Sequence, residues 1–289
     1  MSRQGPSAAT IGGVTDASID WHSIETVLCD LDGVIWLAHH PIAGSVEAVA
    51  ALRASGRRTL FVTNNSVALR AEHEAALAAV GISAVGDVVS SSMAAAHLIE
   101  AGERVLVTGG PGVVEAVEQR GAIVVLNDGR ATEAAFDAVV VGLDRSFDYA
   151  RLTAATTAVL AGARLVATNT DSTFPTPHGL VPGGGSIVAA VATASGVTPV
   201  VGGKPHRPMA DLIAEILTSS AGAFEPDRTL MVGDRPETDG LFAARLGCRF
   251  ALVRSGVPTS ASEASEAGVP VDLDVADLAA VARVLRTGG

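Results

Sequence analysis

Short apolar runs rich in Val, Leu and Ile alternate with longer amphipathic stretches along most of the chain. The clearest predicted strands are 25–30, 58–66, 228–234 and 248–256. Stretches with apolar residues at helical spacing lie at 44–56, 66–81 and 208–220. Strands that alternate with helices are typical of βαβ units, so the pattern predicts an α/β fold with a mostly parallel sheet.

A second series of such runs lies between Thr63 and Lys204, an interval of roughly 140 residues. One βα unit with its loops needs only about 30 residues, so the interval has room for a whole inserted domain. We expect an inserted domain at 93–192, a core domain made of 23–92 and 193–289, and a disordered N-terminal tail at 1–22. The TGGPG turn at 108–112 lacks the full spacing of a dinucleotide-binding loop, so a plain strand-to-helix turn is expected there.

Composition narrows the class of protein. The chain has 289 residues, 48% of them hydrophobic, and a formal net charge of −11, which favours a globular protein with small soluble partners over nucleic-acid or membrane binding. No apolar run approaches the roughly 20 residues of a membrane span, and no signal peptide is evident. Cys29 and Cys248 form no CxxC pair, so we expect free thiols in a reducing cytoplasm. A homodimer is compatible with these features.

Polar residues stand where the predicted strands end. Asp30 and Asp32 lie one residue apart after the first strand, and Gly33 then allows a sharp turn. Two like charges on one face of the chain repel each other unless they bind a cation or share a proton. Because ligands of open α/β sheets bind beyond the carboxyl ends of the strands, this pair is placed for chemistry.

Four segments share this placement: DLDG at 30–33, VTNNS at 62–66, GGKP at 202–205 and GDRPETD at 233–239. In type and order they resemble the four motifs of the haloacid dehalogenase-like (HAD) superfamily of phosphotransferases. The resemblance covers the chain from Thr26 onward and implies a Rossmann-like parallel-sheet core with an inserted α/β cap domain. Only about thirty residues separate Asp32 from Thr63, so the cap must follow the second motif. That order resembles the NagD-like, 4-nitrophenylphosphatase branch.

The residue types fit a Mg²⁺-dependent phosphatase that hydrolyses small phosphate monoesters through an aspartyl-phosphate. Asp30 is the expected nucleophile, and Asp32 is the expected general acid and base. Asp30, Asp234 and a backbone carbonyl near Asp32 are expected to hold the metal. Phosphoryl oxygens are expected to contact Thr63, Asn64 and Lys204. Asp239 is expected to orient metal-bound water or Lys204.

The Pro- and Gly-rich segment 171–186 falls in the proposed cap, where the resemblance implies a substrate-specificity loop. Asn169, Asp171 and His178 are therefore candidate substrate contacts. The adjacent His39 and His40 are expected in a surface loop. Two other functions remain open: phosphomutase or other phosphotransferase activity on the same fold, and a receiver-like phospho-switch. Glycerol phosphate, phosphoglycolate, a sugar phosphate, a nucleotide and pyridoxal phosphate are all compatible substrates.

Overall fold

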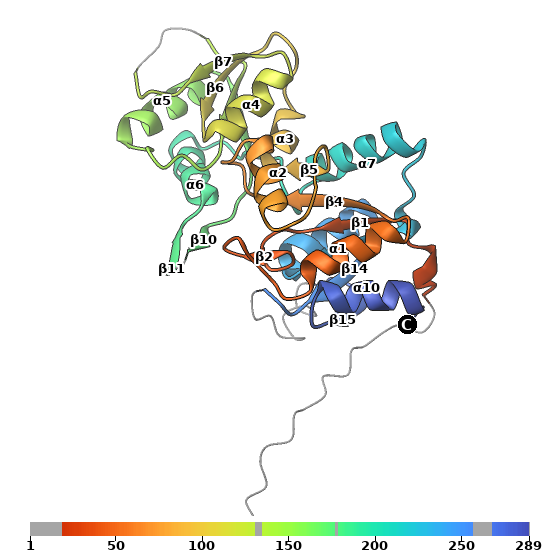
Figure 1. Ribbon diagram of the computed structural model, residues 1–289. Helices are drawn as coiled ribbons and strands as arrows, with labels where there is room; N and C mark the ends of the chain where they lie inside the picture. Colours follow the sequence, from red (N-terminus) through yellow and green to blue (C-terminus); the bar gives the residue numbers. More distant parts are fainter. Residues whose placement is uncertain (1–18, 131–134, 177–178, 257–267, 289) are drawn as a thin grey trace, which may run out of the picture.

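The computed structural model describes residues 19–130, 135–176, 179–256 and 268–288. It contains a six-stranded and a five-stranded parallel sheet and two short antiparallel hairpins (Figure 1). The predicted α/β class, with helices packed on parallel sheets, is confirmed.

The six-stranded sheet has the order β15-β14-β13-β1-β4-β5, and every neighbouring pair is parallel. Its strands are β1 (Thr26–Cys29), β4 (Arg58–Thr63), β5 (Val88–Ser90), β13 (Thr229–Gly233), β14 (Arg249–Val253) and β15 (Leu273–Val275). This order places β1 between β13 and β4. The carboxyl ends of these three strands therefore lie side by side.

Helices cover both faces of this sheet. Along β1, Val27 and Cys29 belong to one buried apolar cluster and Leu28 to another, so the strand is buried on both sides. Burial on both faces explains its continuous apolar run. One face packs against η1 (Trp21–Ser23), α1 (Ser45–Ala54) and α10 (Leu278–Thr287), and the other against α7 (Arg207–Ala221) and α8 (Leu241–Leu246).

The five-stranded sheet has the order β12-β9-β8-β6-β7. Its strands are β6 (Arg104–Thr108), β7 (Ile123–Leu126), β8 (Ala138–Val141), β9 (Arg164–Ala167) and β12 (Val200–Val201). Its helices are α3 (Ser91–Ala96), α4 (Pro111–Gln119), α5 (Tyr149–Leu160) and α6 (Gly184–Ser195). The TGGPG segment is the turn between β6 and α4, as expected. The division into a core and a cap at 93–192 remains a proposal, and β12 joins the second sheet although it lies beyond residue 192.

The remaining elements connect these layers. They are the hairpins β2 (Trp36–Leu37) with β3 (His40–Pro41) and β10 (Thr173–Thr176) with β11 (Gly179–Pro182), the helix α2 (Arg70–Ala79), and the short turns η2 (Pro226–Arg228) and η3 (Pro236–Gly240). Among the described residues, none of the helices combines the length and the apolar character that crossing a membrane requires.

Two ends of predicted segments differ from expectation. Residues 1–18 of the predicted tail lie outside the described residues, whereas Trp21, near its end, is 1% exposed and part of the core. Helix α2 begins at Arg70 rather than near Ser66, because the Glu72 carboxylate accepts a hydrogen bond from the Leu69 amide and so sets its first turn.

Candidate active site

Three neighbouring strands bring the first, second and fourth motifs together. Asp30 directly follows β1, Thr63 ends β4, and Asp234 directly follows β13. The Asp30 amide donates to the Val232 carbonyl at 3.0 Å, which holds the end of β1 against β13. The parallel register of the sheet thus gathers side chains that are more than 200 residues apart in the sequence.

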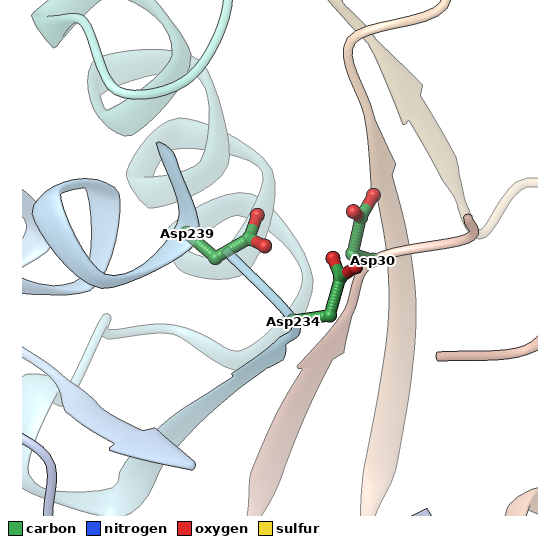
Figure 2. A group of neighbouring side chains, drawn as sticks. All are labelled: Asp30, Asp234 and Asp239. Atoms are coloured by element: carbon green, nitrogen blue, oxygen red, sulfur yellow. The ribbon is translucent and has the colours of Figure 1, made fainter. Parts of the chain in front are cut away.

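Asp30, Asp234 and Asp239 form an acidic cluster, with one carboxylate oxygen of each within 4.8 Å of the other two (Figure 2). Asp234 is 2% exposed and Asp239 is fully buried. Figure 2 shows Asp30 and Asp234 beside each other at two strand ends, with Asp239 facing them from η3. Three converging carboxylates that are largely shielded from solvent form a set of oxygen ligands suited to a hard cation.

Two glycines make room for the Asp234 carboxylate. A Cβ at Gly33 would lie 2.4 Å from Asp234 Oδ2, and a Cβ at Gly256 would lie 2.0 Å from the same oxygen. Gly33 also has φ +86°, a conformation that side chains disfavour. The chain therefore approaches this carboxylate from two sides in a way that only glycine permits.

Lys204 connects two members of the cluster. Its Nζ lies 2.7 Å from Asp239 Oδ1 and 2.9 Å from Asp30 Oδ1, and its side chain is 2% exposed. Burial alone would lower the pKa of Lys204, but the Asp239 and Asp30 carboxylates outweigh it and raise that pKa. Burial raises the pKa of Asp239, and the Lys204 ion pair opposes that rise. Lys204 is therefore a buried ammonium held at the edge of the acidic cluster.

Asp30 and Asp32 lie in different surroundings. Asp30 Oδ1 accepts a hydrogen bond from the Leu31 amide at 2.8 Å in addition to its ion pair with Lys204. The Asp32 side chain is open to solvent, yet loss of hydration and the nearby Asp30 charge raise the pKa of Asp32. A raised pKa favours the protonated carboxyl, which can give a proton to a leaving group. The two carboxylates are thus suited to different tasks.

Asn64 joins the second motif to the proposed cap. Its Nδ2 donates to Asp171 Oδ2 at 3.2 Å and to the Lys204 carbonyl at 3.0 Å. Its own carbonyl accepts from Asn169 Nδ2 at 2.8 Å and from Ser91 Oγ at 2.7 Å. Burial raises the pKa of Asp171, and the bond from Asn64 opposes that shift.

The structure places most of the predicted site residues in one region. These residues lie at the ends of the strands or on segments that contact the strand ends: Asp30, Asp32, Thr63, Asn64, Asp171, Lys204, Asp234 and Asp239. Asp239, expected to contact metal-bound water or Lys204, contacts Lys204 and also lies within the acidic cluster. The Asp32 carboxylate lies outside that cluster. Thr63 Oγ1 accepts a hydrogen bond from the Asn65 amide at 3.1 Å. His178 lies outside the described residues.

Two contributions were missed from the sequence. Ser91 supports the Asn64 carbonyl, and Gly256 leaves space for Asp234. Ser91 occurs in a run of serines that resembles any helix start, and Gly256 follows a strand as many turn glycines do. No local signal distinguishes these residues, because their roles depend on partners far away in the chain.

Comparisons with known proteins agree with this geometry. The family model described as Haloacid dehalogenase-like hydrolase matches residues 27–123, and a second, HAD-hydrolase-like model matches residues 201–281. The chain is 38% identical to a D-glycerol 3-phosphate phosphatase of Mycobacterium tuberculosis over 81% of its own length and 64% of that protein, so it spans less than two thirds of this relative. It is 38% identical to chronophin of Mus musculus, over 80% of this chain and 81% of that one.

A solved structure also matches. The glycerol phosphate phosphatase of Mycobacterium tuberculosis in complex with magnesium superimposes with a TM-score of 0.81 at 34% identity, covering 93% of this chain and 80% of that chain. The resemblance that the four motifs predict is confirmed.

Proposed function

Because this chain belongs to the haloacid dehalogenase-like hydrolase family, and the relatives it matches are phosphatases, we propose that it is a Mg²⁺-dependent phosphatase of small phosphate monoesters. The observation that carries the proposal is the position of Asp30. Its carboxylate pairs with a buried ammonium and lies within 4.8 Å of two further carboxylates at the carboxyl edge of the sheet.

Asp30 attacks phosphorus and forms the aspartyl-phosphate. Its Oδ1 is held by the Leu31 amide and by Lys204, so its carboxylate is oriented before the substrate arrives. Asp32 gives a proton to the leaving oxygen and later takes one from the water that opens the aspartyl-phosphate. The raised pKa of Asp32 supports the first of these duties.

Lys204 and Thr63 bind phosphoryl oxygens. Lys204 contributes positive charge from a buried position, and the Thr63 hydroxyl contributes a neutral donor at the end of β4. The Asn64 side-chain amide donates to Asp171 and to the Lys204 carbonyl, so the backbone amide of Asn64 is its proposed contact for phosphate. Asp239 fixes the Lys204 ammonium through the 2.7 Å ion pair.

The residues present fit a magnesium ion. Asp30, Asp234 and a backbone carbonyl near Asp32 would hold it, and Asp239 adds a third carboxylate within range. The close approach of Gly33 and Gly256 to Asp234 fixes the position of that buried carboxylate in the cluster. When bound, Mg²⁺ supplies positive charge against the phosphoryl oxygens of a dianionic ester.

The cap segment at 93–192 sets substrate selectivity in this proposal. Asp171 is hydrogen-bonded to Asn64 of the second motif, which supports a position at the mouth of the site. We propose Asp171 and His178 as contacts to the leaving group. Glycerol phosphate is the first substrate to test, since relatives carry that name.

Phosphate release from a set of small esters, with and without Mg²⁺, tests the activity. Asp30→Asn removes the nucleophile while keeping the shape of the side chain, so it should abolish turnover with the circular dichroism spectrum unchanged. Asp211→Asn, a matched change on the exposed surface of α7, should retain the wild-type rate. Full activity of Asp30→Asn would reject the assignment, and transfer to a sugar hydroxyl instead of water would indicate a phosphomutase.

The cellular setting and assembly belong to the same proposal. Cys29 and Cys248 are free thiols, and Cys29 ends β1 whereas Cys248 precedes β14, which supports a reducing, cytoplasmic location. A homodimer is proposed as well, and light scattering would measure it.

A further inference from the structure

The hairpin that follows the first motif has an unusual turn. Strands β2 and β3 are joined by Ala38 and His39, which have φ values of +48° and +64°. These are the only positive φ values among the described residues that are not glycines. Two central residues with positive φ form the hairpin turn that Asn and Gly favour, because a Cβ is strained there. Strain of this kind persists where the surroundings hold it and is common at functional sites.

The His39 ring is held in place by Trp36. The two ring centroids are 5.0 Å apart with an interplanar angle of 50°, and Trp36 is 2% exposed. Trp36 is in turn anchored to the first motif, because its carbonyl accepts a hydrogen bond from the Gly33 amide at 2.8 Å. The His39 side chain itself is exposed. The turn therefore exposes the His39 imidazole, and the buried Trp36 ring beneath it holds the imidazole in place.

The ring lies on the Asp32 side of the site. The backbones of Asp32 and Trp36 form an isolated β-bridge, and the His39 ring packs on the Trp36 ring, so His39 lies next to the end of the first motif that carries Asp32. In the proposed reaction Asp32 contacts the ester oxygen that departs from phosphorus. Because Asp32 and His39 are both exposed at this end of the first motif, His39 would border the space that the leaving group enters in the proposed reaction.

We propose that His39 is a specificity-determining residue that donates a hydrogen bond to a hydroxyl or carboxylate oxygen of the leaving group. This inference rests on the proposed function. It assigns the enzyme to phosphate esters of short polyols and hydroxy acids rather than to plain alkyl esters. The strained turn fixes the imidazole before binding, so less side-chain entropy is lost when the substrate arrives.

The test compares kcat/KM for glycerol 3-phosphate and for propyl phosphate, which lacks the two hydroxyls. The wild-type enzyme should prefer glycerol 3-phosphate. In His39→Gly and His39→Asn the ratio of the two kcat/KM values should fall by about three- to tenfold, the range of one net hydrogen bond. Both replacements suit a positive φ, so the hairpin should keep its turn. Ala38→Gly relaxes the same turn but keeps the imidazole, so its ratio should fall less than the ratio of either His39 variant.

Several results would overturn the inference. A wild-type ratio near one, an unchanged ratio in both His39 variants, or an equal fall in Ala38→Gly would each show that the ring does not contact the leaving group. Normal hydrolysis with an unchanged ratio would reject only the role of His39. Hydrolysis of neither ester by the wild-type protein would reject this inference, and failure to release phosphate from the whole set of small esters would reject the proposed function as well.

Discussion

Two carboxylates one residue apart differ in their partners. Asp30 is paired with the Lys204 ammonium and accepts a hydrogen bond from the Leu31 amide, so its carboxylate is fixed in position. Asp32 has no ion pair among the described residues, stays open to solvent, and has a raised pKa. In the proposed reaction, these surroundings suit Asp30 to attack phosphorus and Asp32 to give a proton.

Asp32→Asn tests that separation. The variant keeps the nucleophile but loses the proton for the leaving group. With glycerol 3-phosphate the leaving alkoxide is strongly basic, so phosphoryl transfer should slow by about 10² to 10⁴. With 4-nitrophenyl phosphate the leaving group departs unprotonated, and a burst of nitrophenol followed by a slow steady state is expected. Single-turnover kinetics measure both transfer steps.

The two esters serve as controls for each other within one variant. A misfolded or metal-depleted variant would lose both transfer steps together. An equal loss of transfer for both esters in a variant that still folds and binds Mg²⁺ would contradict the role of Asp32 as a proton donor.

At the site, residues that end strands could be predicted and residues that support them could not. Asp30, Thr63 and Asp234 follow apolar runs in a parallel sheet, and that topology forces their side chains to one edge. The contact of Asn64 with Asp171 joins residues 107 positions apart that follow strands of different sheets, and no periodicity encodes it. His39 was expected in an ordinary surface loop because its strain is visible only in the backbone angles.

At the scale of elements, the glycine-rich turn before α4 is a contact point rather than a phosphate loop. The Gly112 amide donates to the Val67 carbonyl at 2.9 Å, so the start of α4 rests on the chain that follows the second motif. A Cβ at Gly112 would lie 2.1 Å from the Ala68 carbonyl oxygen. The glycine therefore permits the close approach of two segments that carry different sheets.

Gly112→Ala should move α4 away from residues 66–68. Because the clash is with backbone, relief requires a shift of the helix start, and such overpacking costs about 1–3 kcal/mol of unfolding free energy. We expect a Tm lower by a few degrees and a lower kcat/KM, since the second motif adjoins the displaced segment. Thermal unfolding and steady-state kinetics measure the two effects.

Gly109→Ala is the matched control. Its Cβ would lie 2.9 Å from Val113 Cγ2, a side chain of α4 itself, so the strain stays within the second sheet and its helices. Its kcat/KM should fall less than that of Gly112→Ala for the same loss of Tm. Equal losses of kcat/KM in the two variants would show that the contact with Val67 and Ala68 does not support the site.

Element types were more predictable than element ends. The strands and helices of both sheets follow the apolar periodicity, because burial on both faces of β1 or on one face of α7 imposes that pattern. The start of α2 depends instead on one local hydrogen bond from the Leu69 amide to Glu72, which overrides the longer helical pattern. A capping hydrogen bond of this kind moves the start of a helix without changing the pattern of hydrophobic residues.

At the scale of the whole molecule, charge is unevenly distributed. The chain carries a formal charge of −11, and three of its carboxylates lie together in the acidic cluster beside the Lys204 ammonium. Like charges in a dry site oppose folding unless a cation compensates them. The stability of the protein should therefore depend on divalent metal.

Mg²⁺ should raise the Tm of the wild-type protein, because a ligand that binds only the folded state stabilises it by about 2.7 kcal/mol at one hundred times its Kd. Asp234→Asn removes one of the repelling charges and one metal ligand. It should therefore unfold at or above the temperature of the metal-free wild-type protein, and its Mg²⁺-induced shift should be much smaller. Asp211→Asn on the surface of α7 removes the same charge outside the cluster and should keep the full shift. Calorimetry in chelator and in excess Mg²⁺ measures all three proteins, and an equal shift in Asp234→Asn and wild type would place the metal away from these carboxylates.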